Sequence, residues 1–314
     1  MLIRDLDVIV VCEINVDIVV SGLGGPPEFG AERAVDDVLL TAGSSGVLVA
    51  TNLADMGMRV GICGLVGDDE FGRFMLLHCR KHGIDSEGVV VDPSQRTGAS
   101  VLLSTCSDRA ILTHPGAMEH FTFDLLRLDI LARARHLHVS SLFLQSALRP
   151  AVPRLFAAAH ALGLSTSLDT GHDPAETWGI DGVLDGVDVF LPNEVEALAI
   201  SGQTESRAAL ESLARRVPAV SVKCGARGAW AARSTERVFE PAYQVRTVDT
   251  TGAGDAFDAG FLNGWLAGDG LGSCVRRGNA CGALTAAHLG GSGALSAAAI
   301  GALLATEPIL GGVE

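Results

Sequence analysis

Short apolar runs alternate with amphipathic stretches along most of the chain. Apolar runs of about four to eight residues between turn residues are typical of buried strands, and apolar residues at every third or fourth position are typical of helices packed on a sheet. The alternation predicts right-handed strand–helix–strand units, and therefore an α/β fold with a mostly parallel sheet covered by helices on both faces. We expect strands at 61–66, 136–139, 165–169 and 187–191, and helices at 70–82 and 150–162. Further helices are expected after the strand at 187–191, up to residue 216.

Two segments depart from this alternation. Residues 16–40 and 98–113 contain short alternating runs and turn residues, which predict a few antiparallel strands outside the main sheet. Repeats, low-complexity tracts and long linkers are not found in the sequence. We therefore expect residues 1–314 to form a single domain, with ligands at the carboxyl ends of its parallel strands.

A glycine-rich segment at residues 249–257, with the sequence Asp-Thr-Thr-Gly-Ala-Gly-Asp-Ala-Phe, carries the clearest chemical signal. Strand-like residues at 238–239 and 243–245 precede it, and apolar residues at helical spacing follow over 256–266. Gly252 and Gly254 let the backbone approach an anion, and the first amides of the helix, from Ala253 to Asp255, have no partner within it. The segment predicts an anion hole, with Asp255 as the base that takes a proton from an attacking hydroxyl. The alternative is a glycine-rich helix start whose aspartate only favours the helix dipole.

This segment resembles the second signature of the ribokinase, or PfkB-like, family of carbohydrate and nucleoside kinases, which reads D-T-x-G-A-G-D-x-F. Further similarities follow in the family's order from about Asp7 to about Gly293. The resemblance implies a ribokinase-like three-layer α/β/α sandwich with a small β-strand lid, formed by segments at about 14–41 and 97–114. It also implies a homodimer through the lid. Asp255 would be the catalytic base, and Gly252, Ala253 and Gly254 would stabilise the transferred phosphoryl group.

The same resemblance assigns residues to the acceptor. Asn15 and Asp17 lie in the segment similar to the family's opening strand, where an aspartate binds substrate hydroxyls; the alternative for Asp17 is an ordinary strand-end carboxylate. Residues 43–57 are similar to the first signature, with Gly43 in place. Ser44 replaces its second glycine, and Leu48 replaces an asparagine that binds the sugar, so one hydroxyl contact is missing or comes from elsewhere.

Other matches concern the nucleotide, for which the resemblance implies ATP with Mg²⁺. Asn193 and Glu196 are similar to the N-x-x-E motif that organises Mg²⁺ and its waters, although helix capping also explains them. Lys223 ends a predicted strand before Gly225 and Gly228, similar to a strand and G-x-x-G turn beside the phosphates. For Lys223 the alternative is a surface lysine at a strand end. A further candidate, Asn279, matches a position beside the adenine, or is a polar residue on an otherwise apolar helix.

A monovalent cation is also implied by the resemblance. Asp249 and Thr251, together with the turn at residues 289–293, are similar to segments whose carbonyl groups hold such an ion, K⁺ for example, in many members. The alternative for the turn is a glycine-rich end of a helix.

The resemblance and the residues together favour a non-phosphorylated sugar with a primary hydroxyl. The lid segments are acidic overall, and Ser45 occupies a position where some relatives carry a lysine. Because Leu48 is apolar, a nucleoside such as adenosine or inosine is an alternative acceptor. A second alternative, suggested by Ser44 and Leu48, is a member that binds a sugar or nucleotide without turning it over.

Composition narrows the partners and the compartment. A formal charge of −14 and a pI of about 5.0 disfavour binding to nucleic acid or anionic membranes. Seven scattered cysteines without a C-x-x-C pair indicate reduced thiols, and the charged N-terminus does not resemble a signal peptide, so we expect a cytoplasmic protein. P-loop and dinucleotide-binding glycine patterns are missing from the sequence.

Overall fold

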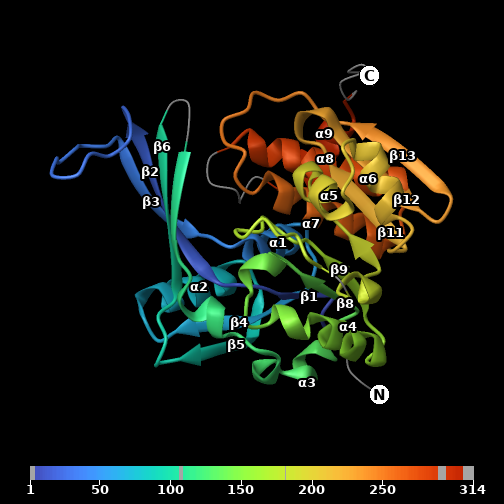
Figure 1. Ribbon diagram of the computed structural model, residues 1–314, viewed down its shortest axis with the longest axis horizontal. Coiled ribbons are helices and arrows are strands. Elements are labelled where there is room, and N and C mark those ends of the chain that lie inside the picture. The colour runs from blue at the N-terminus through green and yellow to red at the C-terminus, as the bar shows by residue number, and fades with distance from the viewer. Residues whose placement is uncertain (1–3, 106–108, 181, 289–294, 307–314) are drawn as a thin grey trace.

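Two β-sheets and the helices around them make up the computed structural model, which describes residues 4–105, 109–180, 182–288 and 295–306 (Figure 1). In this part of the chain the larger sheet has nine strands, in the order β13-β12-β11-β10-β9-β8-β1-β4-β5. The strands from β11 to β5 pair in parallel, and β12 and β13 add an antiparallel edge. The strands are β1 (Val8–Val11), β4 (Val60–Gly67), β5 (Asp85–Asp92), β8 (His136–Val139), β9 (Ser165–Leu168), β10 (Val189–Phe190), β11 (Ala219–Lys223), β12 (Gly228–Arg233) and β13 (Glu236–Pro241).

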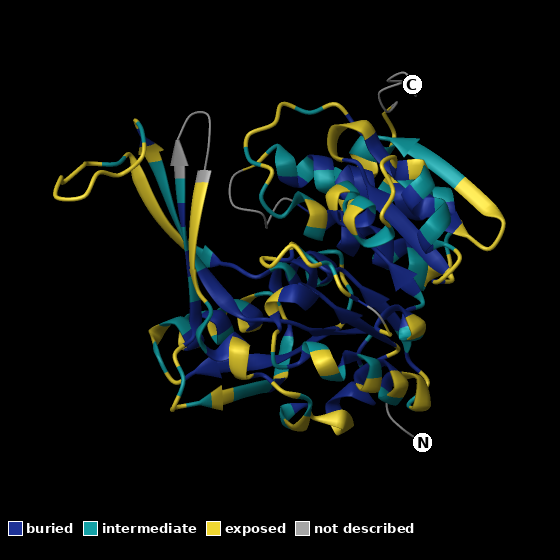
Figure 2. Ribbon diagram, viewed as in Figure 1, coloured by how far each residue is buried: buried dark blue, intermediate teal, exposed yellow. Residues whose placement is uncertain are grey.

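The central strands of the larger sheet are buried, whereas the edge strands β5 and β13 are partly exposed, as Figure 2 shows. In β1, Ile9 and Val11 belong to one apolar core, whereas Val8 and Val10 belong to another. Side chains of a strand point alternately to opposite faces, so a fully apolar strand requires a helix layer on each side. One layer contains α3 (Leu128–Leu131), α4 (Val152–Ala161), α5 (Glu194–Ser201) and α6 (Ser206–Leu213), and the other contains α1 (Ser45–Asp55), α2 (Glu70–Lys81), α7 (Ala253–Ala267) and α8 (Leu271–Ala286). This arrangement confirms the predicted three-layer α/β/α class.

The smaller sheet has the order β3-β2-β6-β7 and extends away from the body of the molecule (Figure 1). Its strands lie largely in segments 16–40 and 98–113, where the sequence departs from the alternation of strands and helices. The expectation of antiparallel pairing is wrong for β2 and β6, which pair in parallel. Both strands follow parallel strands of the main sheet, β1 and β5, so the chain enters the smaller sheet in the same direction twice. The strands are β2 (Asn15–Leu23), β3 (Asp37–Ala42), β6 (Gly98–Thr105) and β7 (Arg109–His114).

Several element boundaries differ from the sequence prediction. The strand expected at 243–245 is not formed, and Tyr243 is instead buried in an irregular segment before α7. The helix predicted at 150–162 begins with a 3-10 turn before α4.

A last helix, α9 (Ala297–Leu304), packs on α8. Among the described helices, none has both the length and the apolar character needed to cross a membrane. The 3-10 helices are η1 (Gly116–His120), η2 (Phe123–Leu125), η3 (Leu142–Leu144), η4 (Arg149–Ala151), η5 (Leu184–Gly186) and η6 (Gly225–Arg227).

Candidate active site

A cavity of about 630 Å³ lies where several parallel strands of the larger sheet end beside the beginning of α7. Asp169 follows β9, Asn193 follows β10, and Lys223 ends β11. Asp255, in the first turn of α7, completes this end of the cavity. The position agrees with the general rule that open α/β sheets bind ligands at the carboxyl ends of their strands. The lining also includes Ser45, Ser141, Gly171, His172, Glu196, Gly225, Ala226, Gly228, Ala242, Tyr243, Gln244, Val245, Thr247, Thr250, Ala253, Gly254, Phe257, Asn279, Gly282, Ala283 and Ala286.

The beginning of α7 faces this cavity through Ala253, Gly254 and Asp255. Gly252 caps the helix in the left-handed region, with φ of 72°, a conformation that glycine adopts at no steric cost. The N–H of Ala253 donates to the carbonyl oxygen of Thr250 at 3.2 Å. The expected anion hole therefore differs in one respect: this amide has a partner inside the loop, and phosphate binding through it would require the loop to adjust.

The groups around Asp255 shift the pKa of its carboxyl in opposite directions. Burial raises the pKa of its carboxyl to about 7, and a hydrogen bond from the Ser45 hydroxyl to Oδ1 acts in the opposite direction. Asp169 and Asp17 raise the pKa further through their charges, whereas Lys223 lowers it. A carboxyl that titrates near neutrality can take up a proton from a hydroxyl and release it again, as a general base must.

Lys223 is buried, so the interpretation as a surface lysine is wrong. Its Nζ lies 2.7 Å from Oδ2 of Asp169 and 3.0 Å from each carboxylate oxygen of Asp258. Although burial opposes ionisation, the two carboxylates raise the pKa of Lys223 above its usual value, and the lysine holds that of Asp169 below its usual range. Burial raises the pKa of Asp258. The three side chains join β9, β11 and α7 through one ion-pair cluster, which we call the Lys223 cluster.

Asn193 and Glu196 form a capping box at the start of α5. The Asn193 side chain accepts from the N–H of Glu196 at 3.0 Å, and Glu196 accepts from the N–H of Asn193 at 2.9 Å. Burial and the charge of Asp169 raise the pKa of Glu196 to about 7. The capping alternative is thus confirmed, but both residues also line the cavity, so capping does not remove them from the candidate site.

Gly225, Gly228 and Asn279 lie along the cavity between β11 and α8. A side chain at Gly228, which has φ of 114°, would overlap the backbone of Glu240 and Pro241. Asn279 is buried, and its Nδ2 donates to the carbonyl oxygens of Glu240 at 2.8 Å and of Pro241 at 3.2 Å. The amide therefore connects α8 to the end of β13 and at the same time forms part of the cavity wall.

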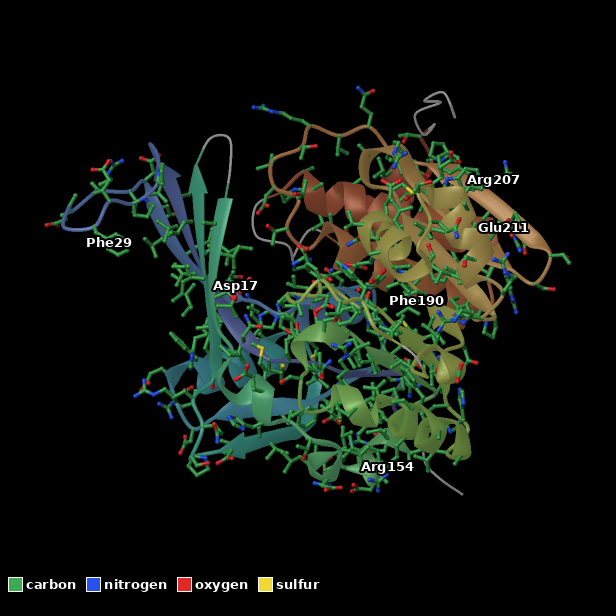
Figure 3. All side chains as sticks on the ribbon, in the orientation of Figure 1. Asp17, Phe29, Arg154, Phe190, Arg207 and Glu211 are labelled. Atoms are coloured by element: carbon green, nitrogen blue, oxygen red, sulfur yellow. The ribbon has the colours of Figure 1, made fainter. Side chains whose placement is uncertain are left out.

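Of the residues expected to bind the acceptor, Asp255 lines the cavity, whereas the others do not: Asn15, Asp17, Gly43, Ser44 and Leu48. Asp17 lies at the base of the smaller sheet, while Phe29 lies in the loop that joins β2 to β3, at the other end of these strands (Figure 3). Nδ2 of Asn15 donates to Oδ1 of Asp17 at 3.1 Å, and burial raises the pKa of Asp17 to about 6. Gly43 packs against that carboxylate, where any larger residue would collide with it.

The two departures from the first signature have clear structural consequences. Ser44 adopts φ of 75°, which glycine adopts more easily, and its hydroxyl donates to the carbonyl oxygen of Glu13. Leu48 is only 5% exposed, so its side chain packs in the protein interior.

The expected cation segments are described in part. The N–H of Thr251 donates to Oδ1 of Asp249 at 2.9 Å, a turn that orders the approach to α7. The third segment, residues 289–293, lies outside the described residues.

Sequence reasoning missed Asp169, Asp258 and the contact of Ser45 with Asp255. Two signals were available: Asp169 is the last residue of the strand predicted at 165–169, and Asp258 lies one helical turn after Asp255. Parallel strands that end at one edge bring such residues together, so a lysine at the end of β11 was a candidate partner for both.

The comparisons with known proteins agree with this fold. Residues 5–298 match the pfkB family of carbohydrate kinases. An ATP-dependent ribose-1-phosphate kinase of Halopiger xanaduensis is 30% identical over 280 residues, covering 88% of this chain and 91% of the relative. Fructokinase-1 of Oryza sativa is 29% identical over 269 residues, covering 79% and 83%. The crystal structure of a putative ribokinase II of E. coli in its apo form has a TM-score of 0.86 at 25% identity, and covers 95% of this chain and 99% of its own. The chain therefore belongs to the PfkB family of carbohydrate kinases, phosphotransferases that act on an alcohol group.

Proposed function

We propose that this sugar kinase transfers the γ-phosphoryl group of ATP to a primary hydroxyl of a non-phosphorylated sugar. The observation that carries the proposal is the position of Asp255, whose carboxyl lies at the wall of a large cavity, beside the beginning of α7 and with a pKa raised to about 7. ATP occupies the cavity, and the acceptor lies between Asp255 and Asp17. We take residues 1–314 as one kinase domain, in which β2, β3, β6 and β7 form the lid over the acceptor.

The transfer needs one proton acceptor and a set of donors for the phosphoryl oxygens. Asp255 takes the proton of the acceptor hydroxyl while the hydroxyl oxygen bonds to the γ-phosphorus, and the bond from that phosphorus to the β,γ-bridging oxygen breaks to release ADP. The amides at the beginning of α7 and the helix dipole stabilise the charge on the transferred group. Asp17, held by Asn15 and Gly43, accepts hydrogen bonds from other hydroxyls of the sugar.

The donor groups at the cavity fit Mg²⁺ held through water. Both oxygens of Glu196 are used within the protein, Oε1 by Nδ2 of Asn193 at 2.5 Å and Oε2 by the N–H of Asn193 at 2.9 Å. Because these oxygens already accept hydrogen bonds, Glu196 and Asn193 would contact water molecules around Mg²⁺ rather than coordinate the ion directly. Bound Mg²⁺ would supply charge neutralisation at the ATP phosphates. Asp249 and Thr251 would hold a monovalent cation such as K⁺ beside the same loop.

The charges at the site support a neutral acceptor. Glu13 and Asp17 are carboxyl groups whose charges interact with that of Asp255. The acceptor would therefore lie among carboxyl groups. Lys223, the lysine of the cavity wall, has its charge balanced by two carboxylates. An acceptor with a phosphate of its own would meet carboxylates in place of a free cation. Because the Halopiger relative is a ribose-1-phosphate kinase, ribose 1-phosphate is the acceptor that tests this proposal most directly.

The test is a coupled ADP-release assay with ribose, fructose, ribose 1-phosphate, adenosine and a keto-deoxy sugar acid as acceptors. We expect turnover with a neutral sugar. Highest kcat/KM with ribose 1-phosphate or with adenosine would contradict the acceptor class, while ADP release with none of the five would favour a binding protein without turnover.

The catalytic assignment is tested with Asp255→Asn. We expect this variant to keep ATP binding and to lose on the order of 10²–10³ or more in kcat, because the amide cannot accept the proton. The matched control is Asp124→Asn, which changes an exposed carboxylate outside the cavity. Near-normal turnover of Asp255→Asn would contradict the proposed role.

We also propose that the protein is a cytoplasmic homodimer that associates through the lid. Exposed apolar side chains on the lid, such as Val38, Leu40 and Leu112, support the association. The described cysteines are buried free thiols, which suits a reducing compartment.

A further inference from the structure

The Asp255 carboxylate is held by a side chain that lies 210 positions away in the sequence. The hydroxyl of Ser45, the first residue of α1, donates to Oδ1 of Asp255. The hydroxyl of Ser140, which follows β8, donates to the Ser45 oxygen at 2.8 Å. Since Ser45 gives its own hydrogen to Asp255, the two serines form a directed chain of donors that ends at the carboxylate.

The backbone fixes both serines in place. The N–H of Ser45 donates to Oε1 of Glu13 at 3.2 Å, and the N–H of Ser140 donates to the carbonyl oxygen of Val11 at 3.3 Å. Each serine has a neighbour in the left-handed region, Ser44 with φ of 75° and Ser141 with φ of 49°. Such conformations cost free energy in residues other than glycine, and they persist where the surrounding structure holds them.

We propose that Ser45, supported by Ser140, is a positioning residue for the catalytic base. By binding Oδ1, it presents Oδ2 of Asp255 to the acceptor hydroxyl and stabilises the ionised form that accepts the proton. The inference rests on the proposed function, since it assigns how that base is oriented.

The other groups around Asp255 cannot replace this contact. Asp169 after β9, Asp17 on β2 and Glu13 before β2 are carboxyl groups, which oppose its ionisation. Lys223 at the end of β11 favours the ionised form, but its Nζ is bound to Asp169 and Asp258. The Ser45 hydroxyl is therefore the uncharged donor, among the contacts of the described chain, that favours the carboxylate directly.

Variants at the two serines test the inference. For Ser45→Ala we expect kcat to fall about tenfold with an unchanged KM for ATP, because a hydrogen bond to a charged group is lost. In a plot of kcat/KM against pH, we expect the acid limb, where the rate falls at low pH, to move up by about one pH unit. Ser45→Thr keeps the hydroxyl and should restore both quantities. Ser140→Ala should move the limb in the same direction by less. A structural role alone would lower thermal stability without moving the limb.

A second readout does not depend on turnover. The Asp255 carboxyl is titrated by ¹³C NMR, with its signal assigned by its loss in Asp255→Asn, in wild type and in Ser45→Ala protein. A higher pKa of Asp255 in Ser45→Ala supports the inference even where no tested acceptor is phosphorylated, so failure of the proposed function is seen separately. Identical titrations of wild type and Ser45→Ala would overturn the inference and leave the base assignment standing.

Discussion

At the scale of single residues, the properties of Asp255 come from its surroundings rather than from its position in a motif. Burial raises its pKa to about 7, whereas the Ser45 hydroxyl and Lys223 favour ionisation. A free aspartate would be ionised throughout the neutral range and would be a weak base. The site therefore converts an ordinary carboxylate into one whose protonation changes near neutral pH.

This balance predicts the pH dependence of the reaction. A base works only when ionised, and lowering the pH through about 7 protonates Asp255, so kcat/KM for the acceptor should fall below about pH 7. Steady-state rates at saturating ATP and Mg²⁺ between about pH 5.5 and about pH 8.5 measure this limb. The control is Glu13→Gln, because burial raises the pKa of Glu13 to about 8. If the limb vanished in Glu13→Gln, it would belong to Glu13 and the prediction would be wrong.

At the scale of secondary-structure elements, the Lys223 cluster determines how α7 sits against the sheet. Asp169 and Lys223 come from neighbouring regions of the sheet edge, and Asp258 is 0% exposed on the face of α7 that packs against them. Buried carboxylates without a partner are costly, so the lysine is required once the two acids are buried. The cluster also lies beside the beginning of α7, since a Cβ atom added at Gly254 would lie 3.8 Å from Nζ of Lys223.

Removing the lysine should therefore destabilise the fold. We expect Lys223→Met to lower the free energy of unfolding by about 3–5 kcal/mol, because it leaves buried charge without compensation. Denaturant titration measures the change, and Lys81→Met, at an exposed position of α2, is the matched control. Adding Asp258→Asn to Lys223→Met should recover part of the loss. Equal stabilities of Lys223→Met and Lys81→Met would contradict the role of the cluster.

At the scale of the whole molecule, the lid carries several exposed large apolar side chains, among them Val38, Leu39, Leu40, Ile111 and Leu112. Strand pairing places Leu40, Ile18, Val101 and Leu112 in one row across the lid. Alternation puts this row on the face opposite to Asp17. Leu40 is 40% exposed and Leu112 is 62% exposed, although a four-stranded sheet normally covers its apolar face. A second copy of the chain would cover this row.

The lid interface predicts the effect of a charge placed on it. Leu112→Glu should convert a dimer into a monomer, as measured by size-exclusion chromatography with light scattering, because a carboxylate would be buried against apolar residues. Leu77→Glu, at a position of α2 that is 58% exposed, is the matched control and should leave the dimer intact. A wild-type monomer, or a Leu112→Glu dimer, would contradict the proposed interface.

The sequence by itself determined the class of fold, the glycine-rich start of α7 and the candidate base, because strand and helix periodicities and the signature at residues 249–257 are local patterns. It did not predict that Lys223 is buried between Asp169 and Asp258, or that Ser45 contacts Asp255. It also missed the parallel pairing of β2 with β6. These features were decided only by the tertiary structure, since Ser45 meets Asp255 across 210 positions and Lys223 meets Asp169 across 54. Whether a polar side chain is exposed or buried with a partner depends on which distant segments the sheet brings to the same edge, and no local pattern records that.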